Sequence, residues 1–229
     1  MTSLQKWGKS VRTTIPVMAG YLVLGAGFGI LLRTRGYGLG WALAMSAFIY
    51  AGSMQYVAID LLTGGASLLT TAVTTLLVNA RHLFYGISML ERYRAAGRYA
   101  PYLIFSLTDE TYSLVAARED LTGAECFRIS LLDQLYWVLG TALGSLAGAY
   151  LDFNTTGIDF SLTALFLTVF TEQWLEMEDH APALIGLGVS IVCRLLFGAD
   201  SFLLPTMGGM LCCLLVLDAR RTKKGGESV

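Results

Sequence analysis

In Asn79-Ala80-Arg81-His82-Leu83-Phe84-Tyr85-Gly86, an arginine and a histidine lie inside a hydrophobic run that extends from Ala66 to Leu90. Such a run can cross a bilayer, because the hydrocarbon core takes about 20 residues of α-helix. A guanidinium near the middle of a membrane helix is costly unless it faces protein, water or a carboxylate. The stretch therefore predicts a transmembrane helix, a functional site around Arg81 and an acidic partner elsewhere in the chain.

The candidate partner is an acidic pair in the next hydrophobic run, within Thr108-Asp109-Glu110-Thr111-Tyr112. Two adjacent carboxylates on one short helix cannot both face lipid, so at least one is expected to be protonated, paired with Arg81 or open to water. A purely structural role stays open, because an ion pair between Asp109 and Arg81 can also simply hold two membrane helices together.

The composition is that of a membrane protein. Hydrophobic residues make up 55% of the chain and charged residues 14%, whereas roughly a quarter of the residues in soluble domains are charged. No basic cluster is interleaved with aromatic residues, which argues against nucleic acid as a partner. The cysteines show no metal-ligand spacing with His82 or His180, so we expect neither a metal nor a cofactor. The expected fold class is an all-α, polytopic protein of the lipid bilayer.

The hydrophobic runs predict roughly seven or eight transmembrane helices in a single domain. We expect these helices at about residues 14–32, 39–62, 66–90, 101–117, 129–151, 160–175, 181–198 and 201–217. Small residues four apart, such as Gly25 and Gly29, predict close packing between helices. Residues 1–12 and 218–229 are polar and are expected to be a cytoplasmic N-terminus and a cytoplasmic tail.

The second hydrophobic run contains Ala51-Gly52-Ser53-Met54-Gln55-Tyr56, where Gly52-Ser53 can interrupt the helix. A broken or re-entrant helix at membrane depth is tolerated only where the freed backbone lines a cavity or is buried in protein, and transporters use such breaks to hold substrates. An unbroken helix with small residues at a packed interface is the alternative.

The two halves of the chain resemble each other weakly. The stretch Ala80-Arg81-His82-Leu83-Phe84-Tyr85-Gly86 corresponds to Cys193-Arg194-Leu195-Leu196-Phe197-Gly198. Internal repeats are typical of transporters. We therefore expect a three-helix repeat with copies at 13–100 and 126–198, a linking helix and loop at 101–125, and a last helix at 199–217. A chance similarity between membrane sequences is the alternative.

The positive charges predict the orientation. With eight spanning helices, nine Lys and Arg residues flank the helices on the side of the N-terminus and five on the opposite side. The positive-inside tendency then places both termini in the cytoplasm. Arg92, Arg94 and Arg98 disagree with this assignment, and one re-entrant segment would move their loop to the N-terminal side.

With these three motifs, around Arg81, around Asp109 and around Gly52, the chain resembles the AzlC family, the large subunit of bacterial branched-chain amino-acid exporters, over about residues 14–217. The resemblance implies export of leucine, isoleucine, valine and, in some members, methionine, driven by the proton gradient. It also implies a small membrane partner of the AzlD type and a location in the bacterial cytoplasmic (inner) membrane.

The residues themselves suggest how an amino acid is bound. A zwitterion needs a cation for its carboxylate and an anion for its ammonium group, roles that fit Arg81 and either Asp109 or Glu110. Neutral hydrogen bonds are expected from Gln55, Tyr56, Asn79 and Tyr85.

Proton coupling is expected from three titratable side chains. The imidazole group is the side chain that ordinarily changes charge near neutral pH, which makes His82 a candidate, and Glu110 can do so when desolvated. Asp109 is the third candidate. The alternative for His82 is a polar contact that merely fastens two helices.

Two other functional classes are weighed. Ser53 and His82 could form the dyad of an integral-membrane hydrolase, but no nucleophile elbow is present and no enzymatic activity is expected. A channel or scaffold subunit for another small solute is the other alternative, and the charges inside the hydrophobic runs weigh against it.

Overall fold

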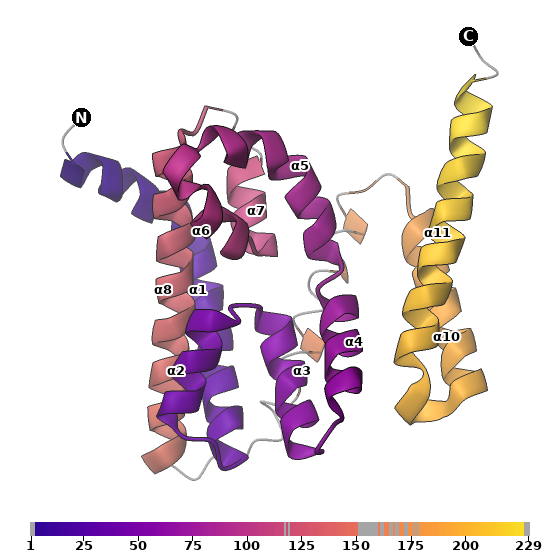
Figure 1. Cartoon of the computed structure of the whole chain (residues 1–229), viewed down its shortest axis with the longest axis horizontal. Helices are drawn as coiled ribbons and strands as arrows, with labels where there is room; N and C mark the ends of the chain where they lie inside the picture. The colour runs from indigo at the N-terminus through magenta and orange to yellow at the C-terminus, as the bar shows by residue number, and fades with distance from the viewer. Residues whose placement is uncertain are drawn as a thin grey trace. The chain divides into compact units, whose positions relative to one another are not determined.

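The computed structural model describes residues 3–116, 118, 120–150, 160, 163, 164, 167, 170, 171, 174, 175, 177 and 179–226. The elements in this part of the chain are all helices (Figure 1). The chain divides into two compact units, Met1–Thr163 and Ala164–Val229, and each is described by itself. Half of the residues of the predicted helix at 160–175 lie outside the described residues, and the predicted repeat stays a prediction.

Two long helices of the first unit lie side by side and run in the same direction. Helix α1 (Ser3–Thr34) begins well before the predicted residue 14, and α8 (Gly123–Tyr150) begins before the predicted residue 129. They approach closely through glycines: a Cβ on Gly25 would lie 2.8 Å from the carbonyl oxygen of Trp137, and one on Gly140 would lie 2.7 Å from that of Leu22. The absence of side chains at these positions lets the two backbones pack against each other.

Residues 39–62 do not form one continuous helix. The alternative prediction, a break near Gly52, is confirmed. The segment forms α2 (Leu39–Phe48) and α3 (Gly52–Thr63), which turn back on each other at residues 49–51 (Figure 1). With 10 and 12 residues, each helix reaches only about half of a 30 Å hydrocarbon core. The α2–α3 hairpin therefore returns to the end of the unit from which it started.

The prediction of one helix over 101–117 is also wrong, because this segment forms a second hairpin. After a 3-10 helix, η1 (Gly97–Tyr99), α6 (Ala100–Phe105) and α7 (Asp109–Ala116) enter from the opposite end of the unit (Figure 1). Local hydrogen bonds explain the turn: the Ser106 hydroxyl donates to the carbonyl of Tyr102, and the Thr108 hydroxyl caps α7 by accepting from the N–H of Thr111.

Between the hairpins, α4 (Leu68–Val78) and α5 (Arg81–Ala95) run in the same direction, so that together they lead from one end of the unit to the other (Figure 1). The unbroken helix predicted over 66–90 is divided at Asn79-Ala80, and its last turns extend beyond residue 90. Arg81 consequently stands at the first position of a helix instead of in the middle of one.

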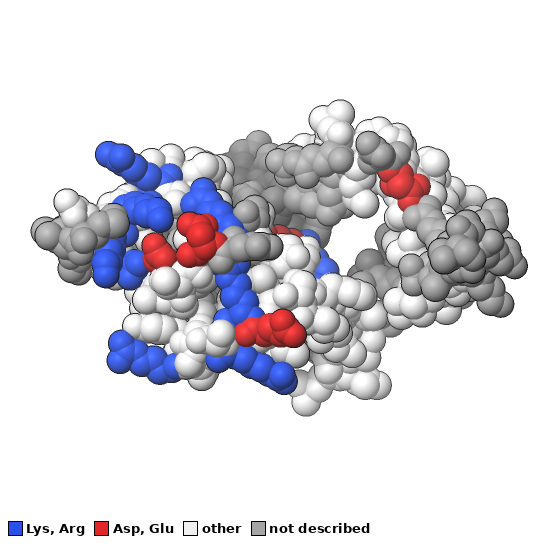
Figure 2. Space-filling model, turned by 90° about the horizontal axis from the view of Figure 1, so that it is seen from above, with Lys and Arg blue, Asp and Glu red and all other residues white. Residues whose placement is uncertain are grey.

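Positive charge gathers at one end of the first unit (Figure 2). Hydrogen bonds tie the segments of this end together: Arg118 Nη1 donates to Thr13 Oγ1 over 2.9 Å, and Arg92 Nη1 donates to the carbonyl of Val115 over 2.6 Å. The start of α1, the end of α5, η1 and the start of α8 lie at this end (Figure 1), and with the loop before α8 they carry Lys6, Lys9, Arg12, Arg92, Arg94, Arg98, Arg118 and Arg128. The end of α1 and the turn after it lie at the other end and carry Arg33 and Arg35. Because the α2–α3 hairpin turns back and does not cross the unit, the segment that carries Arg94 lies at the same end as the start of α1 (Figure 1). Arg92, Arg94 and Arg98 therefore no longer disagree with the positive-inside tendency.

The second unit contains α10 (Ala181–Ser201) and α11 (Leu203–Gly226), which pack against each other. Helix α11 extends into the predicted polar tail. Among the described residues, the segments 5–34 and 181–198 are each long and apolar enough to cross a membrane as one helix. The predicted number of seven or eight such helices is not confirmed, and the hairpins and the division between α4 and α5 shorten the helices predicted at 39–62, 66–90 and 101–117.

Candidate functional site

The tips of the two hairpins meet near the middle of the first unit. The rings of Tyr50 and Phe105 lie 6.4 Å apart. Gln134 of α8 joins the hairpins, because its Nε2 donates to the carbonyl of Ala47 over 3.1 Å and its Oε1 accepts from the hydroxyl of Tyr102 over 2.7 Å. The first residues of α3, α5 and α7 come together beside these tips.

An ion pair links these three helix ends. Arg81 Nη1 lies 2.6 Å from Asp109 Oδ2, and Arg81 Nη2 donates to Ser53 Oγ over 2.9 Å. The side chains of Arg81 and Asp109 are 33% and 24% exposed. Arg81 Nε and Asp109 Oδ1 are buried without a hydrogen-bond partner. The pair therefore keeps one donor and one acceptor that a ligand can use.

The neighbouring carboxylate faces a different side. Glu110 Oε2 accepts a hydrogen bond of 2.7 Å from the hydroxyl of Tyr21 on α1, and this hydroxyl also lies 2.7 Å from Thr108 Oγ1. Successive residues of a helix point about 100° apart, so Asp109 and Glu110 reach different neighbours. Of the two carboxylates that the sequence left open, Asp109 is the one that pairs with Arg81.

A pocket of about 560 Å³ lies between the tip of α2–α3, α5 and α6, within the roughly 300–1,000 Å³ of small-molecule sites. Its walls are mainly branched or aromatic, with Ile49, Leu83, Ile87, Ile104 and Phe105 among them. Asn79 and His82, on either side of Arg81 in the chain, also line it. The His82 Nδ1 atom lies 3.2 Å from the carbonyl oxygen of Asn79, whose side-chain Oδ1 has no partner.

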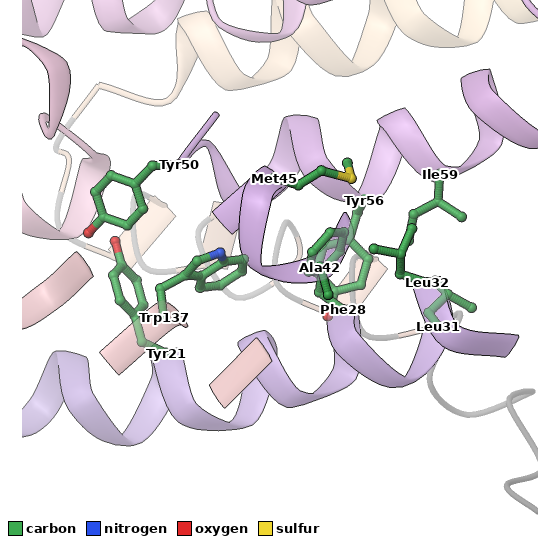
Figure 3. Close-up of a cluster of buried hydrophobic side chains, with 10 residues drawn as sticks. All are labelled: Tyr21, Phe28, Leu31, Leu32, Ala42, Met45, Tyr50, Tyr56, Ile59 and Trp137. Carbon is green, nitrogen blue, oxygen red and sulfur yellow. The ribbon is translucent and has the colours of Figure 1, made fainter. Parts of the chain in front are cut away.

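Gln55 and Tyr56 are placed away from the ion pair. The fully buried Gln55 donates to Ser46 Oγ over 3.2 Å and accepts from Trp137 Nε1 over 2.9 Å. The Tyr56 hydroxyl donates to the carbonyl of Leu24 over 2.7 Å, and its ring packs in the core around Phe28 (Figure 3). These polar groups fasten α3 to its neighbours, and their role in binding stays a prediction.

Tyr85 lies one turn after Arg81 and joins α5 to α7. Its ring stacks on that of Tyr112 with 4.6 Å between the centroids, and it meets the His82 ring edge-on at 6.0 Å. Tyr85 and His82 thus form an aromatic group beside the ion pair.

The proposed hydrolase dyad is not formed by the contacts of this site. The Ser53 hydroxyl accepts from Arg81, and the His82 ring contacts the carbonyl of Asn79.

Sequence reasoning missed Tyr21, Thr111 and Asp133. Asp133 Oδ2 accepts from Thr111 Oγ1 over 2.9 Å, and the Asp133 side chain is completely buried. The prediction that α8 begins at residue 129 placed Asp133 in the first turns of a helix, where a carboxylate needs no explanation. The motif Thr122-Gly123-Ala124-Glu125 is a capping box, in which each end bonds the backbone N–H of the other, and it marks the true start of the helix.

Known proteins are similar to this chain over most of its length. The family model described as AzlC protein matches residues 16–151. The branched-chain amino acid transport protein AzlC of Bacillus subtilis is 45% identical over 209 residues, which cover 89% of this chain and 82% of that protein. An uncharacterized membrane protein of Helicobacter pylori strain 26695 is 42% identical over 207 residues (89% and 91%), and one of Haemophilus influenzae is 41% identical over 216 residues (92% and 87%). No solved structure matches the chain. The chain therefore belongs to the AzlC family.

Proposed function

We propose that this chain is the large subunit of a two-component, proton-coupled exporter of leucine, isoleucine and valine, with methionine as a further candidate substrate. The name of the Bacillus subtilis relative, branched-chain amino acid transport protein AzlC, supports the substrate class. The observation that carries the proposal is the Arg81–Asp109 pair, with an unused donor and an unused acceptor, close to a pocket with branched and aromatic walls.

The substrate binds by entering this ion pair. Its carboxylate takes the place of Asp109 on the guanidinium of Arg81, and its ammonium group binds Asp109. The branched side chain then lies in the pocket, where burial of apolar surface contributes about 25 cal/mol per Å². Asn79 Oδ1 is the neutral group best placed to add a hydrogen bond, because it is buried without a partner and lines the pocket.

The hairpins control access from the two sides. The α2–α3 hairpin enters from one end of the unit and the α6–α7 hairpin from the other (Figure 1). The ion pair joins the first residues of α3, α5 and α7, beside the tips of both hairpins. A site between two such elements is reached from one side when one element moves and from the other side when its counterpart moves. This arrangement supports alternating access, and it weighs against an open channel.

Protons couple to transport at the same site. Protonation of Asp109 removes the negative charge that holds both Arg81 and the substrate ammonium, so the substrate is released. His82, next to Arg81 and in the pocket wall, and Glu110, hydrogen-bonded to Tyr21, are the other exchangeable groups.

The positive end of the first unit faces the cytoplasm. The helix ends and loops at this end carry eight Lys and Arg residues and those at the other end carry two, and the positive-inside tendency assigns the richer end to the cytoplasm of a bacterial inner membrane. The N-terminus lies there, and the basic end of α11 is assigned to the same side. A small AzlD-type subunit completes the exporter.

Efflux of preloaded labelled leucine tests the proposal in cells that make the chain with and without an AzlD-type partner. We expect efflux that needs the partner, stops with an uncoupler, and is lost in Arg81→Ala and Asp109→Asn. His82→Ala should alter the pH profile. Uncoupler-resistant efflux that runs only downhill would favour a channel, and no movement of any branched-chain amino acid or methionine by an inserted complex would refute the substrate assignment.

A further inference from the structure

A second buried carboxyl group lies behind the ion pair. Asp133 on α8 is 0% exposed, and its Oδ2 accepts one hydrogen bond, from Thr111, while its Oδ1 has no partner. The ion pairs of the described residues involve Lys9 and Arg81, not Asp133. The titratable groups that face it are Glu110 of α7, Tyr50 of the α2–α3 tip and Tyr102 of α6. An ionised carboxylate held by a single hydroxyl donor is strongly disfavoured in such a place, and a neutral acid is not.

An unbroken series of hydroxyl groups connects Asp133 with Glu110. The Tyr21 hydroxyl donates to Glu110 Oε2 over 2.7 Å and lies 2.7 Å from Thr108 Oγ1. Thr108 Oγ1 lies 3.2 Å from Thr111 Oγ1, which donates to Asp133 Oδ2 over 2.9 Å. A carboxyl group therefore stands at each end of the series, and every link between them is a group that can both donate and accept.

We propose that Asp133 is a proton-binding site of the transporter, filled from Glu110 through the hydroxyl groups of Tyr21, Thr108 and Thr111. With Glu110 protonated, the three hydroxyl groups can all turn toward Asp133. Each then accepts a proton from the group before it and passes its own proton to the group after it. Glu110 loses one proton, Asp133 gains one, and the hydroxyl groups are left turned the other way. This role rests on the proposed proton-coupled transport.

The α2–α3 tip connects this path to the opening of the site. Figure 3 shows the hydroxyl groups of Tyr21 and Tyr50 pointing toward one another. The Tyr50 ring is buried, its hydroxyl has no hydrogen-bond partner, and its φ of 44° is a conformation that a non-glycine residue rarely adopts. When the tip withdraws Tyr50, water reaches Tyr21, and Asp133 can release its proton to the side that this hairpin covers.

The first test separates coupling from substrate binding in proteoliposomes that hold the complex with its small partner. Asp133→Asn keeps the size of the side chain and its acceptor oxygen but cannot carry a proton. We expect it to retain exchange of labelled for unlabelled leucine at equal pH and to lose leucine accumulation driven by a pH gradient. Thr111→Val should show the same loss. Gradient-driven accumulation at the wild-type rate in Asp133→Asn, or loss of both activities in a well-folded protein, would overturn the proposal.

A second test does not depend on transport. Infrared difference spectra between acid and alkaline pH should contain the carbonyl band of a protonated carboxyl group, absent in Asp133→Asn and present in Asp60→Asn, which makes the same change at an exposed carboxylate. Ser130→Ala, which removes another fully buried side-chain oxygen one turn away on α8, should keep the band and gradient-driven transport. A spectrum unchanged by Asp133→Asn would refute the proton site. The band together with wild-type exchange but no effect of a pH gradient would refute the proposed coupling instead.

Discussion

The two hairpins have similar backbones and different chemistry. In each, a helix ends at a phenylalanine, Phe48 or Phe105, and three residues lead into the next helix. The α2–α3 hairpin presents neutral residues that are deeply buried and hydrogen-bonded to α1 and α8. The α6–α7 hairpin presents Asp109 and Glu110, whose contacts depend on charge. The contacts of the first hairpin therefore do not depend on protonation, whereas those of the second change when protons or substrate bind.

The largest expected effect comes from the charged contact between α5 and the α6–α7 hairpin. Arg81→Ala should abolish export, because it removes the cation that binds the substrate carboxylate. Truncating one partner of a charge pair that is desolvated on binding costs roughly 2–5 kcal/mol, or at least about a 25-fold rise in the substrate Kd. Leucine binding to the purified complex, measured calorimetrically, checks this. Arg81→Lys keeps the charge but not the forked contact with Ser53 and Asp109. It should bind leucine more tightly than Arg81→Ala does. Equal binding by Arg81→Ala and wild type would show that the ion pair is only a fastener.

The matching change in the α2–α3 hairpin should affect stability instead of binding. Gln55→Leu leaves the indole N–H of Trp137 without its partner and removes the donor to Ser46, which keeps its own bond to Thr141, at a cost of roughly 1–3 kcal/mol. A lower Tm in detergent with an unchanged leucine Kd is the expected result. A tenfold weaker Kd at wild-type Tm would instead establish the substrate-binding role that the sequence predicted for Gln55.

A smaller effect is expected from the contact of Arg92 with the end of α7, which attaches the α6–α7 hairpin to α5. Arg92 donates to the carbonyls of Val115, Arg118 and Leu121, which follow or end α7, and such contacts at a helix C-terminus are worth about 0.3–1 kcal/mol. Arg92→Gln should therefore raise amide hydrogen exchange in 106–116 and leave that in 39–63 unchanged. Arg94→Gln, a neighbouring exposed change, is the control. Equal increases in both hairpins would mean that they open together.

The smallest expected effect lies at the start of α8. Hydrogen bonds from the backbone N–H and the hydroxyl of Thr122 hold the pKa of Glu125 below its usual value. This stabilisation is fully present above the pKa that Glu125 has in the unfolded chain and is lost as the pH falls through the pKa in the folded state. The Tm of wild type should exceed that of Glu125→Gln at neutral pH, and the difference should shrink in acid. A constant difference from neutral to acid pH would contradict the capping role.

The ion pair could be predicted in its essentials, whereas the hairpins could be predicted only in part. Arg81 required a carboxylate, and the next hydrophobic run supplied two candidates, Asp109 and Glu110. The break near Gly52 was signalled by small residues, but Ser106-Leu107-Thr108 contains neither glycine nor proline and carries no comparable signal. Asp133 was missed because the predicted helix began too late, although the capping box at Thr122 marks its start.

The sequence by itself determined that the chain is helical, that it suits a bilayer, and that Arg81 needs an acidic partner. These conclusions follow from the cost of placing each residue in an apolar surrounding, which depends on the residue and its neighbours in the chain. Only the tertiary structure decided which segments turn back and which carboxylate meets Arg81. Contacts between distant residues, such as Tyr21 with Thr108 and Gln134 with Ala47, hold the two tips in the interior. Hydrophobic periodicity locates a helix, but it does not show whether the chain crosses the membrane or turns back to the side from which it entered.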